Sequence, residues 1–402
     1  MNEPNARPLD GFRIIEVGQL LAGPYVGSIL GYFGAEVIKV ESPGDGDPIR
    51  KWRVLDDSGT SWWWHSLGRN KKCITANLRN EQGQAIVRQL IDKADAVVEN
   101  FRPGRMEKWG LGPDAFKTSN PGLIYARISG YGQDGPYASR PGFASVCEGV
   151  GGLRYVNGFP DGPPVRPNLS LGDTLAGLHT AFGIVMALVG RMKDPDGAGQ
   201  IIDTALYEAV FNMLEGVVPE FDGGGVVREP SGSTLTGIVP TNTYRCTDGK
   251  FIIIGANGDS IFKRLCDKMD RSDMGEDPRF ADNAGRVEHE PEIDVAITKW
   301  TCSLDSVTAL SLLEEARVPS GPIYNVADML ADDHFKARGL FEEVEVNGKP
   351  LKIPGMVPKF SKTPGRTDWP GPAVGAFNDE ILGELLGISA EDQAKLKDDG
   401  II

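Results

Sequence analysis

The sequence predicts an α/β protein built on a mostly parallel sheet. In the first half of the chain, short runs rich in Val and Ile alternate with longer amphipathic segments, and glycines separate many of them. Strands that alternate with helices are typical of βαβ units, whose crossovers make neighbouring strands parallel. With 402 residues and 40% hydrophobic content, the chain is long enough to bury a large core and to form more than one domain.

The expected elements follow from these patterns in chain order. Residues 12–17 predict a first strand, and a helix from about residue 22 to 33 ends at Gly34, a residue type that often stops helices. Asn80 is a favourable cap for a helix in which apolar residues recur at helical spacing. The other strands of the first half are expected at 36–41, 73–78, 96–101 and 123–129.

Composition changes near Pro219 and indicates a domain boundary. The segment FDGGGVVREPSGSTLTG is rich in Gly, Ser and Thr and predicts a mobile loop. A strand at 250–256 and an amphipathic helix at 259–270 follow it, and the proline-rich tail is expected to end in a short helix near 391–397. We therefore expect a large domain over 1–220, completed by a C-terminal return over 321–402, and a small domain with linkers over 221–320.

Charge and cysteine content argue against several classes of function. The net charge of −14 is unfavourable for a nucleic-acid partner, which requires a basic surface. The five cysteines are widely spaced and form no CxxC or Cys/His cluster, so neither a metal site nor a disulfide framework is supported. The first residues are polar, and the apolar stretch at 180–189 is too short to span a bilayer. We expect a cytoplasmic protein with no membrane association.

Ligands of open α/β sheets bind outside the carboxyl ends of the strands. This rule selects four segments, at 18–24, 69–72, 100–106 and 130–137. Their glycines permit close backbone approach, and their cations suit an anionic, nucleotide-like ligand; these cations are Arg69, Lys71, Lys72, Arg102 and Arg105. A basic run is equally typical of a solvated surface. The phosphate-loop and dinucleotide motifs fit poorly, because Gly18-x-x-x-x-Gly23 lacks the Lys-Ser/Thr that would follow.

Asp173 lies just before a long apolar helix in SLGDTLAGLHTAFGIVMAL. Asp is a favoured helix cap, and this structural role explains the residue on its own. The same position surrounds the carboxylate with backbone N–H donors and the positive end of the helix dipole, which keep it ionised as a nucleophile requires. Both interpretations stay open at this point. His179 on the same helix fits a packed histidine, and Trp62–Trp64 fit buried aromatics better than an adenine platform.

Taken together, these segments resemble the class III CoA-transferase family, also called the CaiB/BaiF family. The resemblance covers nearly the whole chain and is carried by PLDGFRIIEVGQLLAGPYVGSILGYFGAEVIKVESPGDGDPIR, GRNKKCITANL, ADAVVENFRPG, LIYARISGYGQDGPYA, SLGDTLAGLHTAFGIVMAL, VPSGPIYNVADML and LLGISAEDQAKLKDDGII. It implies a large Rossmann-like domain with a smaller α/β domain between its two parts. It also implies an interlocked homodimer.

The resemblance further implies that Asp173 attacks an acyl-CoA thioester. CoA then passes through an acyl–aspartyl anhydride and an aspartyl-CoA thioester to a free carboxylic acid, without a permanently bound cofactor or metal. Oxyanion donors are expected from glycine-rich loops, Gly130–Gly132 among them. By motif match, the implied CoA contacts are Gln19, Ala22, Arg69, Lys71, Lys72, Asn100, Phe101, Arg102, Arg105, Met106 and Tyr131.

Members of this family differ in substrate, and three alternatives stay open. Racemases carry Gly-His-Asp where this chain has Gly142-Phe143-Ala144, and phenylalanine cannot abstract a proton. Formyl-CoA:oxalate transferases carry a glycine run where this chain has SGSTLTGIVPTN at 231–242, a form associated with dicarboxylate substrates. A relative that only binds CoA is disfavoured by the presence of Asp173. We expect a succinyl-CoA-type donor and a dicarboxylate acceptor, with Arg140 or Arg166 pairing with the distal carboxylate.

Overall fold

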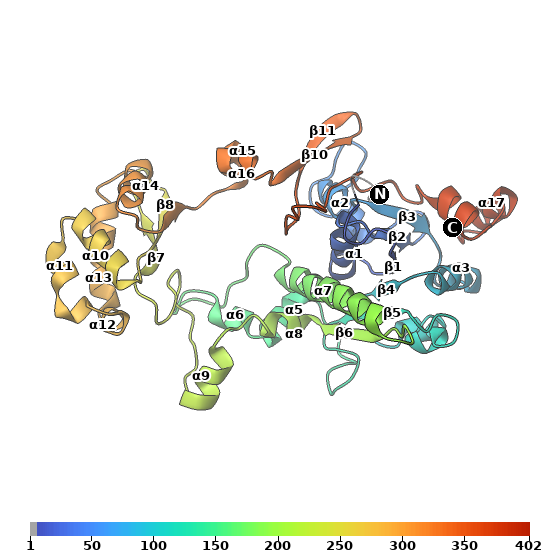
Figure 1. The fold of residues 1–402 in the computed structure, drawn as a ribbon, viewed down its shortest axis with the longest axis horizontal. Helices are drawn as coiled ribbons and strands as arrows, with labels where there is room; N and C mark the ends of the chain where they lie inside the picture. The colour runs from blue at the N-terminus through green and yellow to red at the C-terminus, as the bar shows by residue number, and fades with distance from the viewer. Residues whose placement is uncertain (1–5) are drawn as a thin grey trace. The chain divides into compact units, whose positions relative to one another are not determined.

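The computed structural model describes residues 6–402, and the polar residues 1–5 lie outside the described part. The chain forms two compact units (Figure 1). The first comprises Met1–Leu153, Pro167–Glu215 and His334–Ile402, and the second comprises Arg154–Arg166 and Gly216–Asp333. The chain therefore leaves the first unit twice, and the short excursion at Arg154–Arg166 was not anticipated from composition.

The first unit is built on a six-stranded parallel sheet. Its strands are β1 (Arg13–Glu16), β2 (Glu36–Glu41), β3 (Lys71–Thr75), β4 (Ala96–Glu99), β5 (Ile124–Ser129) and β6 (Ile201–Ala205). Their spatial order is β3-β2-β1-β4-β5-β6, and every neighbouring pair is parallel. Connectivity reverses direction between β1 and β4, which is the switch point where doubly wound sheets bind their ligands. The predicted α/β class with a parallel sheet is confirmed.

Helices cover both faces of this sheet. Ile14 and Ile15 of β1 are fully buried in different clusters, as expected when successive side chains point to opposite faces. One face packs against α1 (Ala22–Tyr32) and α7 (Leu171–Lys193), which lie side by side in Figure 1. The other face packs against α3 (Glu81–Asp92) and against residues of the C-terminal return. The C-terminal residues thus complete the core of the first unit.

Helix α7 is longer than the apolar stretch at 180–189 suggested. By length and composition this 23-residue helix is able to cross a membrane, with a mean hydropathy of 1.5 in its apolar window, of which 39% is buried. Its buried residues, Ala176, Thr180, Ile184 and Leu188 among them, pack toward α1 and the sheet. We therefore interpret α7 as a core helix of the first unit with one exposed side.

The remaining elements of the first unit are shorter. Its other α-helices are α2 (Trp62–Leu67), α4 (Arg105–Lys108), α5 (Ala144–Val150), α8 (Leu206–Phe211) and α17 (Ala390–Asp398). A hairpin of β10 (Phe341–Val346) and β11 (Lys349–Pro354) precedes α17, and three short helical turns span Pro48–Lys51, Pro113–Phe116 and Asp379–Leu385. Two further short helices, α6 (Leu153–Val156) and α16 (Asp333–Ala337), lie where the chain passes between the units.

The second unit holds a three-stranded antiparallel sheet with helices. Its strands are β7 (Thr241–Arg245), β8 (Phe251–Gly255) and β9 (Ser320–Pro322), of which β8 matches the predicted strand. Its helices are α9 (Val217–Gly224), α10 (Asp259–Lys268), α11 (Ser272–Glu276), α12 (Asn283–Glu288), α13 (Glu290–Thr301), α14 (Ser306–Glu315) and α15 (Val326–Ala331), with a turn at Pro278–Phe280. The loop predicted after Pro219 is partly wrong, because α9 continues until Gly225 adopts a left-handed conformation.

Candidate functional site

A pocket of about 250 Å³ opens at the carboxyl ends of β1 to β4. This edge, at the reversal between β1 and β4, is where a doubly wound sheet binds a nucleotide-like ligand. Two arginines and several apolar side chains line it, which suits a ligand with both anionic and flat apolar parts. The pocket is lined by Val17, Gln19, Val40, Glu41, Ser42, Ala76, Asn77, Leu78, Arg79, Phe101, Arg105 and Trp109.

Three of the predicted CoA-contact residues, Gln19, Phe101 and Arg105, line this pocket. Asn100 lies beside it and binds the loop between β1 and α1: its Oδ1 accepts the Gln19 N–H at 2.7 Å, and its Nδ2 donates to the Gln19 carbonyl at 2.8 Å. Gly18 makes this contact possible, because a Cβ there would stand 2.9 Å from Asn100 Oδ1. The structure thus joins the segments that follow β1 and β4, as predicted.

The segment at 69–72 does not lie at the carboxyl edge of the sheet where the pocket opens, so its predicted placement there is wrong. Strand β3 begins at Lys71, two residues before the predicted start at Cys73, so the segment lies at the amino end of the strand. The residues that follow β3 at its carboxyl end include Arg79, which lines the pocket. Sequence analysis did not select Arg79 as a site residue.

The cations of this segment already have partners inside the protein. Lys71 is fully buried, and its Nζ lies 2.9 Å from Glu16 Oε2. Arg69 is buried as well and donates to the carbonyl oxygen of Pro354 at 2.8 Å. Lys72 pairs with two carboxylates, at 2.7 and 2.6 Å. These side chains stabilise the first unit and do not reach into the pocket.

The other predicted CoA contacts vary in exposure. Ala22 and Met106 are buried in the core, with 2% and 0% exposure. Arg102 is exposed in the loop after β4. Beneath that loop, Glu99 accepts the Phe101 N–H at 2.7 Å, and burial raises the pKa of Glu99 to about 7 although Arg127 opposes the shift. These contacts fix the backbone that carries Phe101.

Asp173 lies in the first turn of α7 and is partly buried. Ser170 occupies the N-cap position, so Asp173 is the third helical residue and is not the cap itself. The backbone N–H of Gly172 donates to Oε1 of buried Glu148 at 3.2 Å. Burial, with the charges of Asp173 and Glu148, raises the pKa of the Cys147 thiol to about 11. The thiol therefore stays neutral beside the carboxylate.

The loop after β5 reaches the same place. Cys147 Sγ donates to the Gly130 carbonyl at 3.3 Å, which ties this loop to α5 near Asp173. The backbones of Gly130 and Gly142 approach so closely that a Cβ on Gly130 would stand 2.9 Å from the Gly142 Cα. Tyr131 is nearly buried and packs against two other tyrosine rings, at 5.9 and 5.8 Å between centroids.

The loop between β1 and α1 links Asp173 to the pocket. Gly177, one turn after Asp173, lies against this region, since a Cβ on Gly177 would stand 2.9 Å from the Ala22 carbonyl oxygen. Gln19, three residues before Ala22, lines the pocket. The helix that carries Asp173 and the pocket therefore both contact the segment from Gln19 to Ala22, and all of these residues belong to the first unit.

The other residues considered from the sequence have varied surroundings. His179 is bonded through Nδ1 to the Leu175 carbonyl at 2.8 Å, and Trp64 is fully buried under Arg50, 3.8 Å from its ring centre. Arg140 stacks on Tyr137 at 3.6 Å, and Arg166 belongs to the second unit. Within residues 6–402, the His, Cys, Asp and Glu side chains form no group of three that would hold a metal ion.

The parallel sheet, the pocket at its switch point and the nearby helix terminus define a nucleotide-binding type of α/β protein. A family model described as CoA-transferase family III matches residues 9–378. The chain therefore belongs to CoA-transferase family III, which confirms the resemblance seen in the sequence. As a member of this family, it is an enzyme whose substrates are CoA thioesters.

Similar proteins support this assignment over the whole chain. Succinyl-CoA–D-citramalate CoA-transferase of Chloroflexus aurantiacus is 45% identical, over 97% of this chain and 97% of that protein. Succinyl-CoA:glutarate CoA-transferase of Homo sapiens is 33% identical, over 97% of this chain and 91% of that protein. The crystal structure of a CaiB/BaiF family protein from Brucella suis superposes with a TM-score of 0.83 at 35% identity, covering 94% of this chain and all of that one (100%).

Proposed function

We propose that the chain transfers CoA from a succinyl-CoA-type donor to a free dicarboxylate, with Asp173 as the covalent acyl carrier. The observation that carries this proposal is the place of Asp173 in the first turn of α7, a helix that packs against the start of α1, directly after the loop that lines the pocket. Backbone N–H groups and the helix dipole keep a carboxylate ionised there. Three relatives that are 31–45% identical are named for succinyl-CoA, which supports the donor class.

The proposed reaction consists of four acyl-transfer steps. A carboxylate oxygen of Asp173 attacks the donor thioester carbonyl, the C–S bond breaks, and CoA leaves as a thiolate. The thiolate attacks the Asp173 carbonyl of the resulting anhydride, and the donor acid leaves with the bridging oxygen. The acceptor carboxylate attacks the aspartyl-CoA thioester and expels the thiolate. The thiolate then attacks the acceptor carbonyl, which frees Asp173 and forms the new acyl-CoA.

Neither a metal nor a strong base is required, because carboxylate and thiolate alternate as nucleophile and leaving group. Each tetrahedral intermediate needs N–H donors for its oxyanion, and we assign these to backbone amides of the loops beside Asp173. Arg79 and Arg105 would pair with anionic groups of CoA, while Phe101 contacts an apolar part. Arg140, which belongs to the same unit as Asp173, would bind the distal carboxylate of the acceptor.

We further propose that the enzyme is a homodimer of the cytoplasm. Along the exposed side of α7, four large apolar residues recur at helical spacing, and each is 45–62% exposed; these are Leu178, Phe182, Met186 and Val189. A continuous apolar stripe of this kind on a long helix indicates a surface that a second copy covers. The five cysteines are free thiols, as is typical of a reducing compartment.

The test combines turnover with trapping. A panel of acyl-CoAs and free acids is incubated with the protein, and CoA exchange is followed by mass spectrometry. Hydroxylamine added during turnover should convert Asp173 into a hydroxamate, and Asp173→Ala should abolish exchange. Asp392→Ala is the matched control, because Asp392 is the third residue of α17 as Asp173 is of α7. Full exchange by Asp173→Ala would exclude the proposed nucleophile.

A further inference from the structure

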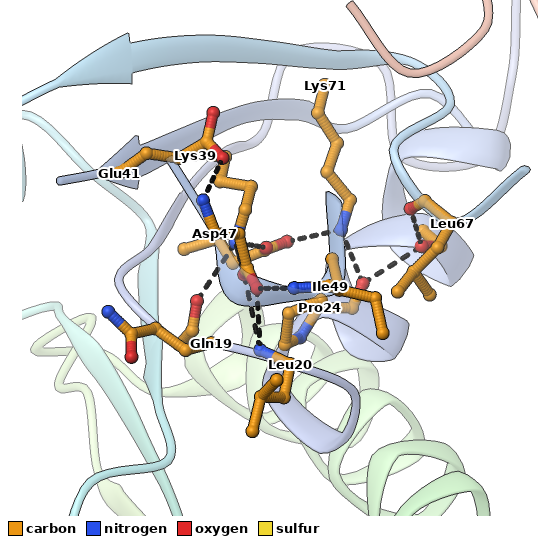
Figure 2. Close-up of polar contacts among 12 residues, drawn as sticks. Gln19, Leu20, Pro24, Lys39, Glu41, Asp47, Ile49, Leu67 and Lys71 are labelled. Carbon is orange, nitrogen blue, oxygen red and sulfur yellow. Dashed lines mark hydrogen bonds and ion pairs between the residues drawn. The ribbon is translucent and has the colours of Figure 1, made fainter. Parts of the chain in front are cut away.

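The loop between β1 and α1 is held by buried side chains along its whole length. Four successive backbone polar groups each bind a side chain from another part of the first unit, and Figure 2 shows the bonds between Leu20 and Asp47. These contacts are Gly18 O with Lys39 Nζ at 3.0 Å, Gln19 N with Asn100 Oδ1 at 2.7 Å, Gln19 O with Asn100 Nδ2 at 2.8 Å, and Leu20 N with Asp47 Oδ1 at 3.0 Å. The loop therefore has a fixed shape before any ligand binds.

Leu20 shows why such restraint is needed. Its φ of +64° lies in the left-handed region, which a leucine rarely adopts because its Cβ crowds the backbone. A residue of this kind persists only where its surroundings hold it in place. Asp47 supplies that restraint, because both of its carboxylate oxygens accept the Leu20 N–H, at 3.0 and 3.2 Å.

Asp47 is in turn fixed by a buried chain of alternating charges. Its side chain is 1% exposed, accepts the Ile49 N–H at 3.0 Å and lies 2.8 Å from Lys39 Nζ. Lys39 also pairs with Glu16 at 2.9 Å, and Glu16 pairs with Lys71 at 2.9 Å (Figure 2). Burial alone would lower the pKa of Lys39, but Asp47 and Glu16 outweigh it and raise that pKa above its ordinary value. Lys39 therefore remains charged.

None of these four charged side chains lines the pocket, so the proposed chemistry does not use them directly. Their effect reaches the site through the loop. Gln19 precedes Leu20 and lines the pocket. Ala22 lies two residues after Leu20, and its carbonyl oxygen packs against Gly177 of α7, one turn after Asp173. A change in the direction of the peptide at Leu20 would therefore move both Gln19 and Ala22.

We propose that Asp47 is a positioning residue for the transferase reaction. By bonding the N–H of Leu20, whose backbone is strained, it aims Gln19 at CoA and keeps the start of α1 against Gly177 of α7, one turn after Asp173. This inference rests on the proposed function, because it assumes that the pocket binds CoA and that Asp173 carries the acyl group. It predicts that loss of the Asp47 charge weakens CoA binding and slows transfer in a protein that remains folded.

The experiment compares Asp47→Asn with Asp95→Asn. Asp95 is a matched control because its carboxylate accepts the Arg13 N–H at 2.8 Å, at the opposite end of β1, and pairs with Arg191 at 2.6 Å. Both variants lose one charge that binds a backbone N–H and a cation. CoA affinity is measured by calorimetry, and kcat and KM are measured below the melting temperature of each variant. Hydrogen exchange of a peptide covering 17–25 reports on the loop.

Asp47→Asn should bind CoA about tenfold more weakly, equivalent to about 1.4 kcal/mol, because a neutral acceptor bonds less strongly than a carboxylate. Its kcat should fall and its KM rise, and its 17–25 peptide should exchange faster. Asp95→Asn should lose stability but keep wild-type affinity and kcat. If both variants match the wild type within twofold in affinity and kcat, Asp47 has no positioning role.

Two additions keep the outcome decisive. If Asp47→Asn does not fold, the charge-balanced double variant Lys39→Met/Asp47→Asn removes the ion pair as a unit and should show the same loss of CoA affinity. Wild-type affinity in the folded double variant would overturn the inference. If the wild type binds CoA but exchanges none, the proposed function fails, and the affinities of Asp47→Asn and Asp95→Asn still test the effect of Asp47 on the loop.

Discussion

Replacing Gly177 by alanine tests the contact between α7 and the start of α1. The added Cβ would stand 2.9 Å from the Ala22 carbonyl oxygen and 3.1 and 3.2 Å from two carbons of Tyr25. The nearest atom is backbone, so the contact cannot be relieved by turning a side chain. To restore an ordinary contact of 3.4 Å, α7 must move by about 0.5 Å relative to α1.

The expected magnitude follows from two opposing effects. Alanine in a helix interior is more favourable than glycine by about 1 kcal/mol. Overpacking against backbone costs about 1–3 kcal/mol, so the variant should lose up to about 2 kcal/mol of stability. Gly190 lies on the same helix with no atom within 4 Å of its added Cβ, and Gly190→Ala should therefore gain about 1 kcal/mol. The two variants should differ by up to about 3 kcal/mol.

Turnover should fall as well as stability. Asp173 is four residues before Gly177, and a misplacement of about 1 Å near a reacting group can cost about 100-fold in rate. For a shift of half that size we expect CoA exchange by Gly177→Ala to fall at least about tenfold, while Gly190→Ala remains at the wild-type rate. Thermal melts and initial rates of CoA exchange measure both quantities. The reasoning is refuted if Gly177→Ala is as stable and as active as Gly190→Ala.

Three further predictions concern pH, thiols and assembly. Burial would raise the pKa of Asp56, but hydrogen bonds from Ser58 and His65 lower that pKa below its ordinary value. The ionised Asp56 therefore stabilises the fold above its pKa in the unfolded chain, and this stabilisation is lost as the pH falls through its pKa in the folded protein. Asp56→Asn should therefore cost about 2 kcal/mol at pH 7, and the difference in unfolding free energy from the wild type should shrink below about pH 4; a constant difference would contradict this account. Among the five cysteines only Cys302 is exposed, so iodoacetamide at neutral pH should label Cys302. It should spare Cys147, which is buried and whose pKa is raised to about 11. Rapid labelling of Cys147 would contradict its burial and show that the site is open to solvent. Phe182→Glu, on the exposed side of α7, should weaken the proposed dimer by at least about 2 kcal/mol, seen as monomer in sedimentation, and an unchanged mass would place the interface elsewhere.

The alternation of strands and helices was visible in the sequence because each buried strand is short and apolar and each helix is amphipathic. The start of β3 was not visible in the sequence, because Lys71 and Lys72 resemble a run of solvent-exposed charged residues. Their partners Glu16 and Glu36 are 36 or more positions away in the chain and become neighbours only when the sheet forms. Strand β6 was also missed, since its outer residues are partly exposed at the sheet edge.

The candidate site was predictable to a similar degree. The rule for doubly wound sheets selected the loops after β1 and β4, and the structure joins them through Asn100 and Gln19. The same rule could also have selected Arg79, because the predicted third strand ends at residue 78, directly before it. The restraint of Leu20 by Asp47 depends on a left-handed backbone and a buried ion pair, neither of which has a local sequence pattern.

The central claim is that Asp173 is the covalent carrier, so that one oxygen of the acceptor acid remains in the side chain of Asp173 after turnover. A single turnover with an acceptor whose carboxylate carries ¹⁸O, followed by digestion and mass spectrometry, tests it directly. Our account predicts that one ¹⁸O atom appears in the peptide containing Asp173. If the acyl-CoA product forms and that peptide carries no ¹⁸O, Asp173 is not the covalent carrier.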